Sequence, residues 1–230
     1  MIEIITGNIF TSKCQTIVNT INCVGAMGKG VAFEYKLRYP EMCKKYIELC
    51  NERMINIGKL WLYKAPDRWI LNFPTKFHWK YPSKEEYLLK GLRKFVETYR
   101  EKQITSIAFP ILGASNGGLS EEISMAIMKE YLSKCNDIII EIYRYDPNVN
   151  DDLYLDFKKF WLEHSDDTLS KESGMRKQYI RLIRQTLLLD NIHAMNQLLK
   201  TKGIGEDTLE KAFQTAKKLS LQSSISFNDL

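Results

Sequence analysis

Two glycine-rich loops dominate the first half of the chain, and each follows a short apolar run and precedes a helical pattern. The first loop (residues 25–30, GAMGKG) comes after the apolar run 16–21, and the second loop (residues 112–118, LGASNGG) comes after the run 104–109. Short apolar runs bounded by glycine and polar residues are typical of buried strands. A strand–loop–helix order that occurs twice predicts a layered α/β domain, with a ligand at the carboxyl ends of its strands.

The rest of the first 148 residues fits the same class. We expect further strands at 2–5, 60–64, 69–73 and 138–143, and helices at 28–38, 41–52, 83–100 and from 120 onward. Ser83 and Glu86 have the spacing of a capping box, so we expect Ser83 to be the N-cap of its helix. Ser120 precedes Glu121 and Glu122 and is expected to cap the next helix.

The chain changes character near residue 148. Clusters of β-branched residues become rare, and apolar residues recur at helical spacing in 179–187 and 209–219. A length of 230 residues suits one domain with a small appendage. We therefore expect a main domain over residues 1–148 and a helical C-terminal extension over 149–230, with a frayed end.

Charge and hydropathy exclude some classes of protein. The net charge is +5, and residues 151–230 hold 12 basic and 12 acidic residues by count, so the whole excess lies in residues 1–150. A basic surplus of this size suits a phosphate-bearing ligand or nucleic acid, or simply a solvated surface. No apolar run approaches the roughly 20 residues of a membrane span. The first residues also lack the basic start of a secretory signal.

Cysteine and histidine usage predicts no metal site. The five cysteines are irregularly spaced and form no C-x-x-C pair, and the three histidines lie far apart. We expect no metal and no cofactor, and we expect the thiols to be reduced, as in a cytoplasmic protein. Cys23 lies just before the first loop, but no histidine–aspartate pair accompanies it, so packing is its favoured role.

Neither loop matches a standard phosphate-binding signature. The first loop has the wrong glycine spacing for a Walker motif, and Phe33 stands where the dinucleotide fingerprint needs its third glycine. The physics of those motifs still applies, because glycine lets backbone N–H groups approach a phosphate and a helix N-terminus attracts anions. One such loop alone is more often a plain turn. Two at the same sheet edge could grip a diphosphate from two sides.

The same residues resemble the macrodomain, an ADP-ribose-binding α/β module. The matching stretches are Gly7-Asn8-Ile9, residues 18–32 (VNTINCVGAMGKGVA), residues 109–118 (FPILGASNGG) and the strand that ends at Tyr143. Residues 71–79 (LNFPTKFHW) narrow the resemblance to DNA ADP-ribosyl glycohydrolases of the DarG antitoxin type, which oppose a toxin that attaches ADP-ribose to thymine. This resemblance covers about residues 1–146 and implies a three-layer α/β/α macrodomain fold with a mixed central sheet.

The resemblance also implies binding roles around both loops. Ser115, Asn116 and Gly117 would supply backbone N–H groups to the diphosphate, and Tyr143 would lie near the adenine. Asn8 stands where many macrodomains hold the adenine amine with an aspartate, and its amide oxygen could still accept that hydrogen bond. The full set of implied ADP-ribose contacts is Asn8, Ile9, Asn19, Gly28, Lys29, Gly30, Val31, Thr75, Leu112, Gly113, Ala114, Ser115, Asn116, Gly117, Gly118 and Tyr143.

Lys76 and Asn22 are the catalytic residues that the resemblance implies. Lys76 would either attack the anomeric carbon of the distal ribose or stabilise charge there, and an uncharged lysine amine is nucleophilic when nearby cations favour that state. The second loop has no acidic residue, so a lysine-only mechanism is implied. Asn22 either contacts the distal ribose or braces the first loop as a buried amide. Phe77 and Trp79 either stack on an extruded base or cap the sheet edge.

Together these residues imply an ADP-ribosyl glycohydrolase that removes ADP-ribose from thymine in DNA. The expected partners are ADP-ribose, ADP-ribosylated single-stranded DNA and an ADP-ribosyltransferase toxin, without a membrane. Two alternatives stay open. One is a non-catalytic module that binds ADP-ribose or another NAD-derived signal, and the other is a hydrolase of protein-linked ADP-ribose.

Overall fold

The computed structural model describes residues 1–228, and the side chains of residues 1–221. The chain divides into two units, one over Met1–Tyr145 and one from Asp146 onward. A frayed end was expected for the last residues of the C-terminal extension, and their side chains lie outside the described range. In the described range, no helix combines the length and the apolar character that crossing a membrane requires.

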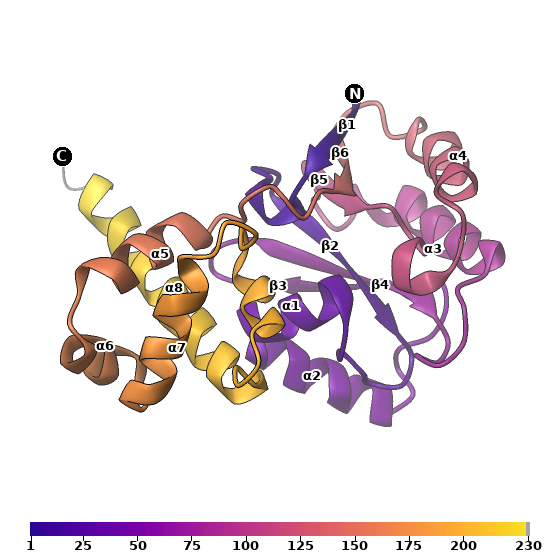
Figure 1. Ribbon diagram of the computed structural model, residues 1–230. Coiled ribbons are helices and arrows are strands. Elements are labelled where there is room, and N and C mark those ends of the chain that lie inside the picture. Colours follow the sequence, from indigo (N-terminus) through magenta and orange to yellow (C-terminus); the bar gives the residue numbers. More distant parts are fainter. Residues whose placement is uncertain (229–230) are drawn as a thin grey trace. The chain divides into compact units, whose positions relative to one another are not determined.

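A six-stranded mixed sheet forms the centre of the first unit (Figure 1). Its strands are β1 (Ile2–Gly7), β2 (Thr16–Asn22), β3 (Trp61–Lys64), β4 (Trp69–Lys76), β5 (Ser106–Pro110) and β6 (Ile139–Tyr145). They lie in the order β1-β6-β5-β2-β4-β3, and every neighbouring pair is parallel except β3 with β4. The carboxyl ends of β1, β6, β5, β2 and β4 therefore share one edge of the sheet.

Helices cover both faces of this sheet and complete a three-layer α/β/α fold (Figure 1). They are α1 (Gly30–Arg38), α2 (Pro40–Asn51), α3 (Glu85–Thr98) and α4 (Glu121–Leu132). Ile17 and Ile70 pack in one core with residues of α1 and α2, whereas Val18 and Leu71 pack in the other core with residues of α3 and α4. This alternation follows from the period of two along a strand. The predicted fold class is confirmed.

The starts of two helices test the capping predictions. Ser120 caps α4 as expected, since its Oγ accepts a hydrogen bond from the Ile123 N–H at 3.2 Å. The prediction that Ser83 caps α3 is wrong, because the N-cap residue is Lys84. Ser83 is buried, and its N–H donates to the Gly117 carbonyl at 2.8 Å. A long-range contact with the second loop has replaced the local capping box.

The second unit consists of helices around a core of their own. Its elements are α5 (Tyr154–Glu163), α6 (Asp166–Ser173), α7 (Lys177–Leu187), the 3-10 helix η3 (Met195–Lys200) and α8 (Glu206–Asn228). Trp161 of α5, Ile180 and Ile183 of α7, and Phe213 of α8 are fully buried. The Trp161 indole N–H donates to the Ile180 carbonyl at 3.1 Å, so the largest side chain of this core has its polar atom satisfied.

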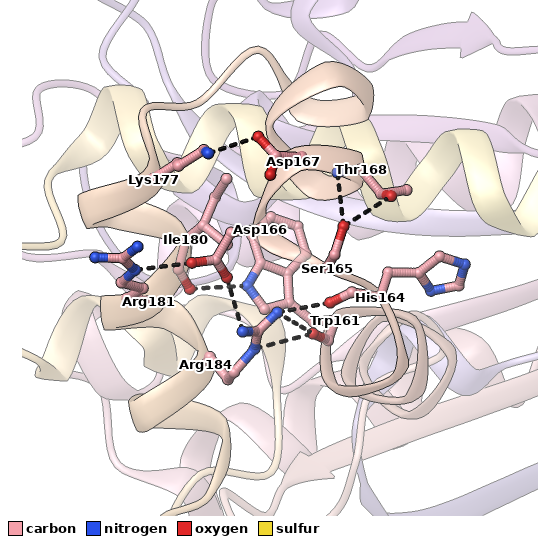
Figure 2. Close-up of polar contacts among 10 residues, drawn as sticks. All are labelled: Trp161, His164, Ser165, Asp166, Asp167, Thr168, Lys177, Ile180, Arg181 and Arg184. Atoms are coloured by element: carbon pink, nitrogen blue, oxygen red, sulfur yellow. Dashed lines mark hydrogen bonds and ion pairs between the residues drawn. The ribbon is translucent and has the colours of Figure 1, made fainter.

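Arg184 joins three of these helices (Figure 2). Its guanidinium donates to the carbonyls of His164 at 2.7 Å and Trp161 at 3.3 Å, at the end of α5 where carbonyls lack helical partners. Arg184 also pairs with Asp166 at 2.7 Å, and Arg181 pairs with the same carboxylate at 2.7 Å. The Asp166 side chain is 18% exposed, and its hydrogen bond with Arg181 holds its pKa below the usual range.

We expect Asp166→Asn to destabilise the protein at neutral pH, and we expect the loss of stability to become smaller as the pH falls. A carboxylate with a lowered folded pKa contributes stability above its unfolded pKa of about 3.9, and this contribution is lost as the pH falls through the folded value. Urea midpoints followed by circular dichroism should therefore differ between wild type and variant at pH 7. The difference should shrink as the pH falls below about 4.

Asp167→Asn is the matched control for this experiment. Asp167 is the next residue of the same helix and pairs with Lys177 at 2.5 Å, but its side chain is 82% exposed. Exposed ion pairs contribute little to stability, so Asp167→Asn should leave the midpoint nearly unchanged at every pH. Equal effects of the two substitutions at pH 7 would contradict the role assigned to Asp166.

Candidate active site at the carboxyl edge of the sheet

The site expected from the sequence lies along the shared carboxyl edge of five strands. The strands β1, β6, β5, β2 and β4 place, in this order, Asn8, Tyr143, the second loop, the first loop and Lys76 at or near their carboxyl ends. Neighbouring strands lie about 4.8 Å apart, so four steps cover roughly 19 Å. The resemblance assigns these positions, in the same order, to the adenine, the diphosphate and the distal ribose. The spatial order of the strands thus follows the chemical order of ADP-ribose.

Lys76 and Asn22 lie opposite each other on neighbouring strands. In the parallel pairing of β2 with β4, Ile21 stands opposite Pro74 and Asn22 opposite Lys76, so Thr75 is an extra residue in β4. Irregularities of this kind re-aim side chains and are frequent beside active sites. Without the extra residue, Thr75 would stand opposite Asn22. Strand pairing therefore brings together the two residues that the resemblance makes catalytic.

The Asn22 side chain braces the first loop. It is 6% exposed; its Nδ2 donates to the Ala26 carbonyl at 2.5 Å, and its Oδ1 accepts from the N–H groups of Val24 at 2.9 Å and Ala26 at 3.3 Å. The Tyr46 hydroxyl donates to the Asn22 carbonyl at 2.9 Å and lies 3.1 Å from Oδ1. Of the two roles open for Asn22, the bracing role is the one that the structure displays. One hydrogen of Nδ2 is left for a ligand.

Asn116 links the second loop to both Lys76 and the first loop. The Lys76 Nζ donates to the Asn116 carbonyl. A Cβ added to Gly30 would lie only 2.6 Å from the Asn116 Nδ2, so the first loop approaches this amide closely. Gly30 also has a φ of +61°, a conformation that side chains disfavour. The two loops therefore touch, and the lysine reaches the point where they meet.

The second loop contains a strained backbone. Gly113, Ser115 and Gly118 have φ values of +69°, +49° and +80°, and Ser115 adopts this conformation although it carries a side chain. The Gly117 N–H donates at 2.9 Å to the carbonyl of Ala114, the N-cap residue of the 3-10 helix η2 (Ser115–Gly117). The turn already uses the N–H that Gly117 was expected to offer to a diphosphate, so the structure does not support this contact. Ser115 and Asn116 are exposed and can still offer theirs.

The first loop ends at the N-terminus of α1. Within the described chain, the N-cap residue Lys29 makes no side-chain cap bond, and the first helical bond runs from the Phe33 N–H to the Lys29 carbonyl at 3.4 Å. The N–H groups of Gly30 and Val31 therefore point out of the helix start. Gly28 and Lys29 are exposed beside them. Such a terminus attracts anions, and the lysine adds positive charge.

The adenine end of the edge differs from the expectation for Asn8. This residue is 2% exposed, and its Oδ1 accepts from the Phe10 N–H at 3.1 Å, which caps the 3-10 helix η1 (Ile9–Thr11). The amide oxygen expected to accept from an adenine amine is thus already used by the backbone. Tyr143 lies within β6, which continues to Tyr145 and so runs two residues beyond the predicted end. Burial raises the pKa of the Tyr143 hydroxyl, so the ring stays neutral.

Two of the predicted ligand contacts lie inside the protein. Asn19 has no exposed surface, and its Nδ2 donates to the Asn72 Oδ1 on the neighbouring strand at 2.9 Å. Leu112 also has no exposed surface, and its carbonyl accepts from the Ser124 hydroxyl at 2.5 Å. A ligand cannot reach either side chain in this structure, so neither side chain supports the predicted contact. Asn19 ties β2 to β4, and Leu112 anchors the base of the second loop.

The chemistry of Cys23 excludes it as a nucleophile at neutral pH. Burial raises its pKa to about 11, so the thiol stays protonated. All five cysteines are buried, and none of them forms a disulfide. In the described part of the chain, no group of three or more histidine, cysteine or acidic side chains is arranged to hold a metal ion.

Tyr46 and Ser83 support the site without any signal in the sequence. The Tyr46 hydroxyl holds Asn22 from helix α2, and burial raises its pKa well above the ordinary value, so it remains a donor. Ser83 packs against the second loop so tightly that a Cβ on Gly117 would lie 2.6 Å from its Oγ. Both contacts join residues far apart in sequence, so no local pattern could have revealed them.

Gly30 and Gly28 form a matched pair for testing the contact between the loops. Gly30→Ala should lower the stability of the protein by about 1–3 kcal/mol, because alanine is strained at positive φ and its Cβ would displace Asn116. A Cβ on Gly28 meets nothing within 4 Å, so Gly28→Ala should cost much less. Urea unfolding measures both values. Asn116→Ala should recover part of the Gly30→Ala loss, and full additivity of the two substitutions would contradict the contact.

Comparison with known proteins identifies the fold of these residues. A family model described as Macro domain matches residues 18–128. A relative from Thermus aquaticus named DNA ADP-ribosyl glycohydrolase is 37% identical over 154 residues, which make up 65% of this chain and 42% of the relative. The chain thus spans less than half the length of that relative.

Two solved structures match the first unit. The macrodomain of Mycobacterium tuberculosis DarG is 39% identical with a TM-score of 0.60, and the match covers 62% of this chain and 97% of that one. Thermosipho africanus DarTG in complex with ADP-ribose is 34% identical with a TM-score of 0.59, over 63% of this chain and 42% of that one. With nearly the whole of a DarG macrodomain matched at this identity, the chain belongs to the macrodomain family.

Proposed function

We propose that this protein is a hydrolase that removes ADP-ribose from a nucleobase in single-stranded DNA, thymine being the expected base. The observation that carries the proposal is the position of Lys76, opposite Asn22 and in contact with Asn116 at the end of the binding edge. The matched relative from Thermus aquaticus is named for this activity. The matched DarTG structure, which contains ADP-ribose, supports this ligand for the same fold.

In this proposal the two loops hold the diphosphate and leave the distal ribose at the lysine. The N–H groups of Ser115, Asn116 and Gly30 and the charge of Lys29 bind the phosphate oxygens. Asn22 keeps the first loop in shape and offers its remaining amide hydrogen to a ribose hydroxyl. Ligand entry at the loops frees the Lys76 amine from the Asn116 carbonyl. The amine then lies beside the anomeric carbon.

Two routes for Lys76 are consistent with this placement. In the first, the uncharged amine forms a bond to the anomeric carbon as the bond to the base nitrogen breaks and the base takes up a proton. The ribose ring then opens to a Schiff base, and water releases ADP-ribose and the lysine. In the second route, the ammonium form stabilises the negative charge on the departing base while water attacks the sugar.

Lys76→Ala should lower the rate of ADP-ribose release from an ADP-ribosylated oligonucleotide by at least about 100-fold. The affinity for free ADP-ribose, measured by calorimetry, should stay within a few-fold, because the diphosphate contacts come from the loops. Lys129→Ala on α4 is the control and should be fully active. Full activity of Lys76→Ala would remove the lysine from the mechanism.

Lys76→Arg separates the two routes. Arginine keeps the positive charge but forms no Schiff base, so the variant should be inactive in the first route and partly active in the second. Borohydride should trap wild-type protein on its substrate only in the first route. Tight ADP-ribose binding without cleavage of either thymidine-linked or glutamate-linked substrate would identify a binding module instead. Cleavage of the glutamate-linked substrate alone would identify a hydrolase of protein-linked ADP-ribose.

A further inference from the structure

A row of exposed aromatic side chains directly follows Lys76. We call residues 77–81 (FHWKY) the aromatic loop. Phe77, Trp79 and Tyr81 are 53%, 53% and 65% exposed. In the described part of the chain, only one other aromatic side chain, that of Tyr145, is comparably exposed. Exposed aromatic groups of this kind mark interaction surfaces more often than chance.

The aromatic loop is held in a defined shape. The Phe77 carbonyl accepts from the Cys23 N–H at 3.1 Å, which ties the start of the loop to β2. The Tyr81 N–H donates to the His78 carbonyl at 3.1 Å. The His78 ring lies near both larger rings, with centroids 5.6 Å from Trp79 and 5.5 Å from Tyr81. The rings thus support each other while much of their surface stays open.

The alternative role, capping of the sheet edge, does not fit these exposures. Phe73 on the same strand and Phe109 on β5 do cover the sheet, and both are fully buried. Phe77 and Trp79 each leave about half of their surface in solvent. Removing that much apolar surface from water would be favourable, so the rings are available for a partner.

The charges and the open space around the aromatic loop favour the binding of a polyanion that carries planar aromatic groups. Residues 74–84 include Lys76, Lys80 and Lys84 and no acidic residue. The Lys80 Nζ lies 5.2 Å from the centre of the Trp79 ring, so a cation already accompanies this face. A recess of about 510 Å³ adjoins Phe77, which lines it together with Cys23, Val24, Cys50 and Arg53.

We propose that the aromatic loop is a platform on which single-stranded nucleic acid stacks the bases next to the modified nucleotide. This proposal rests on the proposed function, because that function supplies the strand. Stacking on aromatic rings with lysines along the backbone is the usual mode of single-strand binding, and duplex bases do not expose their faces.

The test compares Trp79→Leu and Tyr81→Leu with Trp69→Leu. Leucine keeps apolar bulk and removes the ring. Trp69 is the control because it also lies near a lysine, with the Lys64 Nζ 3.8 Å from its ring centre, but at the opposite end of β4. Fluorescence anisotropy with an unmodified oligothymidylate should show affinity weakened about 5- to 150-fold for each platform variant, the cost of one stacked base. Trp69→Leu should bind like wild type.

Activity assays separate this surface from the active site. Release of ADP-ribose from an ADP-ribosylated oligonucleotide should show a raised KM in the platform variants, whereas release from the single ADP-ribosylated nucleoside should be unchanged within about two-fold, because only the oligonucleotide has neighbouring bases. Wild-type binding of oligothymidylate by both platform variants would overturn the proposal. Equal losses on both substrates would also overturn it, since they indicate a structural role. If wild type cleaves neither substrate, the proposed function fails, and the anisotropy result still decides whether the platform binds a single strand.

Discussion

The parallel pairing of β2 with β4 is the interaction on which the rest of the site depends. It sets Asn22 opposite Lys76, and the extra residue Thr75 fixes which side chain of β4 stands at that position. Because parallel strands end at the same edge of a sheet, the loops that follow β2 and β5 and the lysine at the end of β4 all lie at that edge. Asn19 and Asn72 strengthen this pairing through a buried side-chain hydrogen bond. A change in the β2–β4 register would separate the amine from both loops at once.

Asn116 connects Lys76 with both glycine-rich loops. Its carbonyl accepts from Lys76, and its amide lies against Gly30, so one residue connects all three parts of the site. Ser115 beside it holds a φ of +49°, a conformation that costs a non-glycine residue of order 1–3 kcal/mol. Strain of this kind is tolerated where the surrounding contacts fix the backbone. Here those contacts include the bond from Ser83 to Gly117.

Much of the fold followed from local patterns, and the differences lie at polar groups with unexpected partners and at side chains that the fold buries. Short apolar runs located the strands because parallel strands are buried on both faces, and Ser120 capped α4 as its neighbours predicted. Ser83, the N–H of Gly117 and the amide of Asn8 behaved differently, because each bonds a partner that the pattern did not include. The exposed rings of the aromatic loop followed from neither periodicity nor capping. Burial of Asn19 and Leu112 likewise depends on neighbouring strands and helices, which a linear pattern does not specify.

The decisive measurement is a crystal structure of the protein soaked with ADP-ribose. We expect the diphosphate to lie between the first and second loops, with phosphate oxygens about 2.9 Å from the N–H groups of Ser115 or Asn116 and of the start of α1. We also expect the Lys76 Nζ to have left the Asn116 carbonyl and to face the anomeric carbon of the distal ribose. A diphosphate bound elsewhere, or a Lys76 amine turned into solvent with the ligand in place, would show that the two loops and Lys76 do not form the active site.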